Sequence, residues 1–387
     1  MKIAIIAGIF FPHPGGVQVQ IHNICNKLTE LGHKTDCYIY NKCNISNNLY
    51  NIKLINKFIT SLIYFFEYYF TINLKFILKL YLKKKILKNQ YDVYHFHFLN
   101  FKSLIIIDCL KDLNQKIIVT FHGADIQVDS KINYGYRLNL RYSNYLKKIL
   151  PKIDKFFYIS STIKEDLLKF GVKKSKLFYS PNFVCIDKFK KLKKDKKIKK
   201  KLNLITVARF AEKKKGYDIL IEIAKKLVNH KINFKWIIIG DKSEKLFQNN
   251  IFNNYKKNFI ILGNIENRNE KYYPNSKLIR YYSNSNLYVN LARVESFGIT
   301  FVESLASRTP IISFKTRGAN EIIKNKFNGY LVDNKKKLIN KILQLYKNKN
   351  LLRTLDKNLI PSIKKYDADY ISKKIIYNYK QVLKEKN

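Results

Sequence analysis

The sequence predicts an α/β protein with two doubly wound parallel-sheet domains. Strand-like apolar runs alternate with helix-like segments in both halves of the chain. These runs are almost continuously apolar, which is typical of strands that are buried on both faces of a sheet. A chain of 387 residues is also long enough for two domains, each with its own core.

The first alternation predicts a domain over residues 1–189. It opens with a strand at Ile3–Ala7, and a helix follows from about Val17 to Leu31 and ends at Gly32, a natural C-terminal cap. The opening strand is too short for the apolar region of a signal peptide, so we expect a cytoplasmic protein. The later strand-like runs of this half are Tyr91–Phe98, Lys116–Phe121 and Phe156–Ser160.

The second alternation predicts a domain over residues 202–365. The lysine-rich run at 190–201 separates it from the first domain and is typical of a solvated linker. Residues 366–387 have the composition of a final helix. The strand-like runs of this half are Leu204–Ala208, Trp236–Asp241, Phe259–Leu262 and Leu287–Val289.

The segment Glu295–Glu303 carries the most specific chemistry. Its two glutamates flank Gly298, where a strand gives way to a helix predicted over Gly298–Ser307. The first backbone N–H groups of such a helix suit an anion, whereas carboxylates suit neutral hydroxyl groups. A nucleotide sugar, with phosphates between two polyhydroxylated rings, fits both. The candidate N–H donors are Phe297, Gly298, Ile299 and Thr300.

This segment resembles the donor site of retaining glycosyltransferases of the GT-B fold, which carry an E-x7-E motif. Departures from the usual pattern occur at Asn290-Leu291, Arg308 and Arg317 and leave the local turn geometry open. The resemblance, to the family 4 or group 1 type, implies two Rossmann-like domains that face each other across a cleft. It also implies that the final helix packs back on the first domain. The resemblance continues through Ser304–Ala306, Thr309–Ile312, Gly318, Asn320–Ile323 and Asn328–Val332.

The resemblance implies roles for four residues of the second domain. Glu303 would bind the donor ribose, and Glu295 the sugar hydroxyls near the anomeric carbon. Arg209 and Lys215, which follow the domain's first strand, resemble the pair that holds the pyrophosphate. Lys214 is an alternative to Lys215, because the spacing from Arg209 is one residue longer than usual. Two such cations would stabilise the departing diphosphate without a metal ion.

Two elements of the first domain also match the family. Gly15-Gly16 resembles its glycine-rich first loop, where the backbone approaches the donor or the acceptor. His122-Gly123-Ala124-Asp125 resembles the H-G-x-D element, whose histidine contacts the donor sugar. Asp125 would then lie on the acceptor side. Without this resemblance, His122 would be interpreted as a structural residue.

The resemblance therefore implies a retaining hexosyltransferase. The donor would be a UDP- or GDP-sugar, and the acceptor a hydroxyl of a glycan or of a lipid-linked molecule. Synthesis of surface polysaccharide, lipopolysaccharide or glycolipid would be the setting. We expect no cofactor and no metal ion, since the five scattered cysteines show no metal-ligand spacing.

The charge balance suggests anionic partners and leaves two alternatives open. The formal net charge is +46, from 74 Lys+Arg against 28 Asp+Glu. A basic nucleic-acid-binding protein would use this charge, but the lysines are spread along the chain and no nucleic-acid-binding motif is present. A catalytically inactive GT-B-like partner subunit is the other alternative. The intact set of motif residues speaks against it.

Residues 52–90 form an unusual stretch of aromatic and basic residues. The apolar run at Phe58–Phe66 is followed by Glu67 and Lys75, which interrupt it before the ~20 residues of a membrane span. A lysine cluster follows at Lys83–Lys85. Two interpretations stay open. The segment is either an interfacial helix pair on the anionic inner face of the cell membrane or a pair of core helices over the first sheet.

Overall fold

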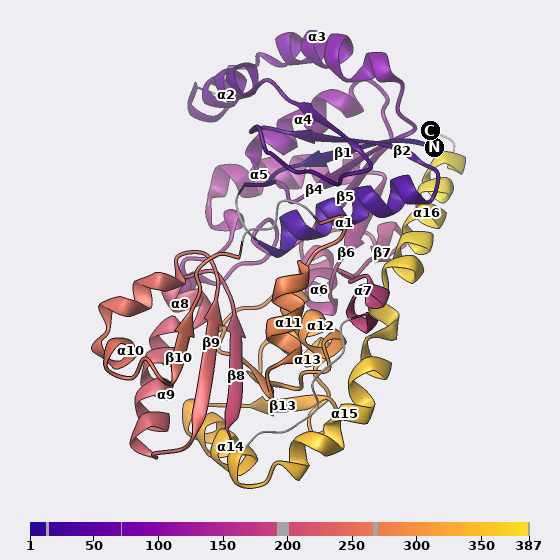
Figure 1. Ribbon diagram of the computed structural model, residues 1–387. Coiled ribbons are helices and arrows are strands. Elements are labelled where there is room, and N and C mark those ends of the chain that lie inside the picture. The colour runs from indigo at the N-terminus through magenta and orange to yellow at the C-terminus, as the bar shows by residue number, and fades with distance from the viewer. Residues whose placement is uncertain (13–14, 71, 192–200, 266–269, 386–387) are drawn as a thin grey trace. The chain divides into compact units, whose positions relative to one another are not determined.

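The structure is a computed structural model that describes residues 1–12, 15–70, 72–191, 201–265 and 270–385. These residues form two compact units, each with its own sheet (Figure 1). The first unit contains most of residues 1–181 together with residues from 369 onward. The second contains residues 182–368, and Gly15 and Gly16 are assigned to it as well. Most of the expected linker at 190–201 lies outside the described residues.

The first unit is built on a seven-stranded sheet in the order β3-β2-β1-β4-β5-β6-β7, in which all neighbouring strands are parallel. The central strands are buried along almost their whole length, as their continuous apolar runs predict. The strands are β1 (Lys2–Ala7), β2 (Lys34–Ile39), β3 (Asn51–Leu54), β4 (Val93–His97), β5 (Ile117–Phe121), β6 (Lys155–Tyr158) and β7 (Leu177–Tyr179).

The helices of the first unit include the last helix of the chain. The Tyr379 hydroxyl of α16 lies 2.6 Å from His95 Nδ1 on β4, and Asp369 forms an ion pair with Lys27 of α1. Residues far apart in sequence therefore share one core. The helices are α1 (Gly16–Glu30), α2 (Lys57–Phe65), α3 (Lys75–Lys85), α4 (Phe101–Lys111), α5 (Leu140–Ile149), α6 (Ser161–Lys169) and α16 (Ala368–Lys384).

The second unit is built on a six-stranded parallel sheet in the order β10-β9-β8-β11-β12-β13. Its strands are β8 (Leu202–Val207), β9 (Phe234–Ile239), β10 (Phe259–Ile261), β11 (Leu287–Asn290), β12 (Ile311–Phe314) and β13 (Gly329–Val332). Its helices are α7 (Ile186–Lys190), α8 (Glu212–Lys215), α9 (Tyr217–Asn229), α10 (Asn250–Asn254), α11 (Ser276–Ser283), α12 (Ile299–Ala306), α13 (Arg317–Ile322), α14 (Lys335–Lys347) and α15 (Asn350–Ile363).

The α/β prediction with two parallel sheets is confirmed. In each sheet the strand order reverses once, between β1 and β4 in the first unit and between β8 and β11 in the second. Such a reversal leaves a crevice at the carboxyl ends of the two strands, where α/β proteins bind ligands. The expected site residues lie just beyond the carboxyl ends of these strands or of their immediate neighbours.

The segment at residues 52–90 folds as a short strand followed by a pair of helices. Asn51–Leu54 is the edge strand β3, which pairs with β2 but is largely exposed and so lacks an apolar pattern. Helices α2 and α3 pack against α4, which separates them from the sheet (Figure 1). In the described part of the chain, no helix combines the length and the apolar character needed to cross a membrane.

Candidate active site

The loop between β11 and α12 is held in one conformation by backbone contacts. Asn290 Oδ1 accepts a hydrogen bond from the Ala292 N–H, and the Gly318 N–H donates to the Glu295 carbonyl at 3.0 Å. A Cβ on Gly318 would lie only 2.5 Å from that carbonyl oxygen, so any other residue would push the loop away. Gly298, at φ +83°, begins α12 in a left-handed conformation that glycine adopts without strain. The backbone that carries Glu295 is therefore fixed.

Glu295 forms an ion pair with Lys215 at the end of α8. The Lys215 Nζ atom lies 2.6 Å from Glu295 Oε2, and the two side chains are 17% and 14% exposed. Gly216, at φ +71°, allows this approach, because a Cβ there would lie 2.1 Å from the Leu291 carbonyl oxygen. Arg293 clamps the same loop through paired hydrogen bonds to Asp218, of 2.8 and 2.6 Å. The fold thus brings together two of the expected site residues.

Positive charge is crowded around this pair. Burial lowers the pKa of Lys214 to about 7, and the nearby charge of Lys215 and Arg209 acts in the same direction, while Glu295 opposes it. Arg209 is exposed and follows β8. Lys215 and Arg209, and Lys214 when it is protonated, therefore place positive charge in the region of one carboxylate. A bound anion would relieve their mutual repulsion.

The second glutamate of the motif has a different environment. Glu303 lies on α12, is 4% exposed, and accepts a hydrogen bond of 3.2 Å from the Tyr282 hydroxyl. Burial raises the pKa of Glu303 to about 7, and the bond from Tyr282 only partly offsets this effect. Tyr282 was not predicted as a site residue, because nothing in the sequence of α11 links it to Glu303.

The start of α12 places the expected N–H donors next to each other. Phe297 and Gly298 are buried, and Ile299 and Thr300 are half-buried. The Tyr288 hydroxyl, from β11, lies 2.9 Å from Thr300 Oγ1 and so orients the first turn of the helix. Glu295, Glu303, Lys215 and this turn all belong to the second unit. Arg209 joins them through its electrostatic effect on Lys214.

In the first unit, Asp125 organises the loop that follows β5. Its carboxylate accepts hydrogen bonds from the backbone N–H groups of Gly123 at 2.8 Å, His122 at 3.1 Å and Leu99 at 3.2 Å. Burial raises the pKa of Asp125 to about 7, although these bonds oppose the shift. The Tyr142 hydroxyl also donates to the Asp125 carbonyl. An acceptor could contact this carboxylate only by replacing its backbone bonds, so the geometry favours a positioning role.

His122 is part of a buried histidine cluster. His122 Nε2 lies 3.1 Å from His97 Nδ1, and the ring of His97 lies 4.1 Å from that of His95. His95 in turn contacts Thr120 and Tyr379. Burial lowers the pKa of His95 and of His122 to about 3, and that of His97 well below its usual value. All three rings are therefore neutral near pH 7.

One ring nitrogen of His122 makes no hydrogen bond within the described part of the chain. Its Nδ1 atom is buried and has no hydrogen-bond partner among the described residues. Because one member of the His97–His122 pair donates and the other accepts, the tautomers of the two rings are coupled. His97 was not predicted as a site residue from the sequence. One signal was overlooked. His97 is the last residue of β4, His122 directly follows β5, and these two strands are parallel neighbours in the sheet.

The two glycines expected at the donor lie at the beginning of α1. Gly15 precedes the helix and Gly16 is its first residue, both beyond the carboxyl end of β1. Within the residues that the structure describes, no group of three or more His, Cys, Asp or Glu side chains is arranged to hold a metal ion.

Comparisons with known proteins identify the family. A family model described as glycosyl transferases group 1 matches residues 187–360, and one described as Glycosyltransferase Family 4 matches residues 14–188. Together they account for most of the chain. The chain belongs to the group 1 glycosyltransferases. A glycosyltransferase resemblance was predicted from the sequence, and the family match confirms it.

Relatives of this glycosyltransferase come from distant organisms. An uncharacterized 41.2 kDa protein in the cps region of Klebsiella pneumoniae is 27% identical over 63% of the chain and 66% of its own length. An uncharacterized glycosyltransferase of Methanocaldococcus jannaschii is 24% identical over 92% of each chain. The alpha-monoglucosyldiacylglycerol synthase of Acholeplasma laidlawii is 26% identical over 47% of the chain and 44% of its own length.

Solved structures share the fold over the full length of this glycosyltransferase. A glycosyltransferase from Rickettsia africae has a TM-score of 0.73 at 19% identity and covers 100% of this chain and 99% of its own. HepE of Anabaena, in complex with UDP-glucose, has a TM-score of 0.71 at 16% identity, with 98% and 100% covered. These neighbours confirm the GT-B fold class.

Proposed function

We propose that this glycosyltransferase moves a sugar from a nucleotide-sugar donor to a hydroxyl group with retention of the anomeric configuration and without a metal ion. The acceptor would be a glycan or a lipid-linked molecule in the synthesis of surface polysaccharide or glycolipid. The observation that carries the proposal is the cluster around Lys215 and Glu295. There a carboxylate, three cations and the start of α12 meet at the carboxyl ends of β8 and β11.

The chemistry of the donor matches the distribution of charge in this cluster. A nucleoside diphosphate carries its negative charge in the middle, and that charge grows as the bond to the sugar breaks. Lys215 and Arg209 would stabilise it, together with the N–H groups at the start of α12. Lys214 is close enough to Lys215 and Arg209 to act with them. Three cations would therefore do what a metal ion does in other transferases.

The two glutamates would bind the uncharged ends of the donor. Glu303, buried beside Tyr282, would accept hydrogen bonds from the ribose hydroxyls. Glu295 would accept from sugar hydroxyls near the anomeric carbon, and its bond to Lys215 holds its side chain in place for this purpose. A carboxylate that accepts a hydroxyl proton gives a charge-assisted hydrogen bond, and this favours a sugar over an apolar ligand.

His122 would contribute a neutral contact to the donor sugar. Its unpartnered Nδ1 would exchange a hydrogen bond with a sugar hydroxyl, while His97 fixes the ring. A neutral imidazole does not attract water or anions as an imidazolium would. The departing phosphate would take the proton of the acceptor hydroxyl, so no enzyme nucleophile is required.

The proposals for the donor base and for a lipid acceptor rest on a structural neighbour and a relative. HepE was solved with UDP-glucose, and the name of the Acholeplasma relative describes a synthase of a glucosylated diacylglycerol. We therefore propose a UDP-sugar as the first donor to test and a lipid-linked acceptor as the first acceptor class. The family match favours an enzyme over the nucleic-acid-binding alternative.

The test is release of nucleoside diphosphate from a panel of UDP- and GDP-sugars by the purified full-length chain. We expect slow hydrolysis of one donor, which a suitable acceptor accelerates. Proton NMR of the first product should show the anomeric configuration of the donor. Excess EDTA should leave the rate unchanged. Absence of any release would favour the inactive-subunit alternative, and an inverted product or a metal-dependent rate would overturn the proposed mechanism.

A further inference from the structure

The outer side of α2 and α3 is a large apolar surface. Nine large apolar side chains between residues 58 and 80 are at least 38% exposed, and no other stretch of similar length in the described chain has as many. Several contact each other, since the ring of Phe65 lies 5.3 Å from Tyr69 and 5.4 Å from Phe70. We name this surface the α2–α3 face; it consists of Phe58, Leu62, Phe65, Tyr69, Phe70, Ile72, Phe76, Ile77 and Leu80.

Both helices are apolar on two opposite sides. In α2 the exposed Phe58, Leu62 and Phe65 follow helical spacing, and Ile63 is buried on the other side. In α3 the exposed Phe76 and Leu80 form one stripe, and the buried Leu78 and Leu82 form another. A surface helix normally buries one stripe and exposes polar residues on the other. A second apolar stripe of this size indicates a surface that another apolar body covers.

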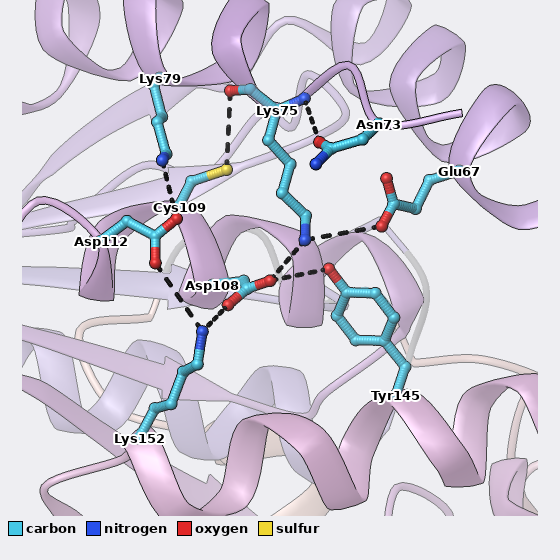
Figure 2. A network of polar contacts seen from close by, with 9 residues as sticks. All are labelled: Glu67, Asn73, Lys75, Lys79, Asp108, Cys109, Asp112, Tyr145 and Lys152. Carbon is cyan, nitrogen blue, oxygen red and sulfur yellow. Dashed lines mark hydrogen bonds and ion pairs between the residues drawn. The ribbon is translucent and has the colours of Figure 1, made fainter. Parts of the chain in front are cut away.

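A polar network fixes which side of the helices faces outward (Figure 2). Lys75 of α3 reaches inward to Asp108 of α4 at 2.6 Å and lies 3.6 Å from Glu67. Asp108 also accepts hydrogen bonds from Lys152 and from the Tyr145 hydroxyl, and Lys79 pairs with Asp112. Although burial acts in the opposite direction, the bonds from Lys152 and Lys75 hold the pKa of Asp108 below its usual value.

This network means that the apolar side is not free to turn inward. Rotating α3 to bury Phe76 and Leu80 would break the ion pair of Lys75 and leave Asp108 buried with one partner fewer. Loss of one member of such a buried pair is strongly destabilising, because it leaves an uncompensated buried charge. The exposure of the α2–α3 face is therefore built into the packing of the first unit.

The charge around the α2–α3 face has one sign. Glu67 is the one acidic residue between positions 57 and 91, and its side chain is turned toward Lys75 and only 12% exposed. The lysines at both ends of the helix pair are exposed: Lys57, Lys83, Lys84, Lys85 and Lys88. Exposed phenylalanine and tyrosine flanked by lysine suit the boundary between acyl chains and anionic headgroups. A protein partner would not require a rim of uniformly positive charge.

We propose that the α2–α3 face docks on a bilayer that contains anionic lipid. The aromatic and aliphatic side chains insert into the headgroup region, and the flanking lysines bind lipid phosphates. Apolar insertion and charge attraction then act together, as two weak anchors do in stable peripheral binding. This inference stands on the first unit alone and does not depend on the donor chemistry proposed above.

The position of the face connects it with the acceptor side of the proposed reaction. Tyr68, between the helices, contacts the start of α5 through bonds from Asn139 at 2.7 Å and from Arg141 at 2.5 Å. Leu140 is 76% exposed there, and Tyr142, one half-turn later, bonds to the Asp125 carbonyl. The docked surface thus adjoins the helix that supports the His122–Asp125 loop. An acceptor carried in the bilayer would be presented on this side of the first unit. This statement about the acceptor rests on the proposed function.

Co-sedimentation of the full-length chain with vesicles tests the docking. The chain should bind vesicles of phosphatidylcholine mixed with phosphatidylglycerol and bind phosphatidylcholine alone weakly. Replacing Phe58, Phe76 and Leu80 by Ser should lower binding to the mixed vesicles at least tenfold. Replacing Lys83, Lys84 and Lys85 by Gln should also lower it at least tenfold, because each lysine near an anionic surface contributes to binding. Binding of the parent chain should weaken as salt rises.

Matched controls separate docking at the α2–α3 face from nonspecific apolar and electrostatic binding. Lys335, Lys336 and Lys337 form another run of three lysines, and their replacement by Gln should leave binding within about twofold. The same holds for Ser at Phe247, Phe327 and Tyr377, which are exposed elsewhere. Equal binding to both vesicle types, no binding, or equal losses in the controls would overturn the proposal. Self-association abolished by the same three apolar replacements, without lipid binding, would mean that a second copy covers the face. Donor hydrolysis by every variant, measured without lipid, tests the proposed function separately.

Discussion

The candidate site residues of the two units differ in electrical character. In the second unit, Lys215 and Glu295 form a partly exposed ion pair with Lys214 and Arg209 nearby. In the first unit, His122 belongs to a buried cluster whose rings are all neutral. Both sets lie at the carboxyl ends of parallel strands next to a reversal of strand order. The same backbone architecture thus supports two opposite electrostatic environments.

This difference indicates which part of a nucleotide sugar each set of residues would suit. A diphosphate needs fixed positive charge, and the charge must be accessible to solvent before the ligand arrives, because a buried uncompensated cation is costly. A neutral sugar needs hydrogen-bonding groups that do not change their charge, which burial provides. We therefore expect charge-removing changes in the second unit to act on catalysis most strongly. Changes in the histidine cluster should act more weakly.

Lys215→Ala should have the largest effect. We expect kcat for donor hydrolysis or transfer to fall about 10²–10³-fold, as when one donor to a developing charge is removed. Lys213→Ala, on the same helix and exposed, should change kcat by less than about twofold and serves as the matched control. The measurement is steady-state release of nucleoside diphosphate.

A double variant decides what Lys215 does. If Lys215 only neutralises Glu295, the variant Lys215→Ala/Glu295→Gln should be as active as Glu295→Gln alone. Stabilisation of the leaving diphosphate predicts a large further loss relative to Glu295→Gln. Lys214→Ala in the same assay tests the neighbouring lysine. If only this variant loses rate, Lys214 rather than Lys215 stabilises the leaving diphosphate.

Glu303→Gln should weaken the donor complex and stabilise the fold at the same time. The Michaelis constant for the donor should rise about tenfold, because a hydrogen bond to a charged acceptor is worth about 1.5–3 kcal/mol. The folded pKa of Glu303 is about 7, above the ordinary value of 4.5. Its contribution to stability is therefore complete below pH 4.5 and is lost as the pH rises through 7.

Urea unfolding at two pH values tests the stability part of this prediction. At pH 8 the Gln variant should be more stable than the parent, by on the order of 3 kcal/mol or less, and the two should be equal near pH 4. Equal stability at pH 8 would contradict the buried position of Glu303. A lower stability of the variant at both pH values would do the same.

Much of the fold could be predicted because its strands are buried and continuously apolar. The start of α12 and the loop at Glu295 were located within about one residue by the glycine and the change of period. The edge strand β3 could not be predicted, since both of its faces are largely exposed and its residues show no alternation. Helix α16 was predicted as a helix, but its contact between Tyr379 and His95 depends on residues 284 positions apart.

The site residues were predictable where a local pattern specifies them. Glu295, Glu303, His122 and Asp125 lie within such patterns, and their roles remain proposals. Tyr282 was missed, because it meets Glu303 through the packing of two helices rather than through a motif. The sequence also could not predict which apolar side of α2 and α3 faces outward. Helical spacing shows two apolar stripes but not which one the ion pairs of Lys75 turn inward.

His97→Leu should have the smallest of these effects on the reaction. Without its bond to His97, the ring of His122 would lose the contact that holds it in place. We expect kcat to fall about tenfold while the donor Michaelis constant changes by less than about threefold. His97→Gln, which can still bond to His122, should retain most of the rate. A structural role alone predicts equal thermal destabilisation and no difference in kcat between these two variants.

Calorimetric titration with UDP, and with GDP in parallel, tests the central claim most directly. If the second unit alone takes up the diphosphate charge, one of the nucleotides should bind the full-length chain. Lys215→Ala should then weaken that binding at least about tenfold, on the order of one charge-assisted contact. Lys213→Ala and His97→Leu should bind it as the parent does. Unchanged affinity in Lys215→Ala, or a comparable loss in His97→Leu, would contradict the assignment of diphosphate binding to the charged residues of the second unit.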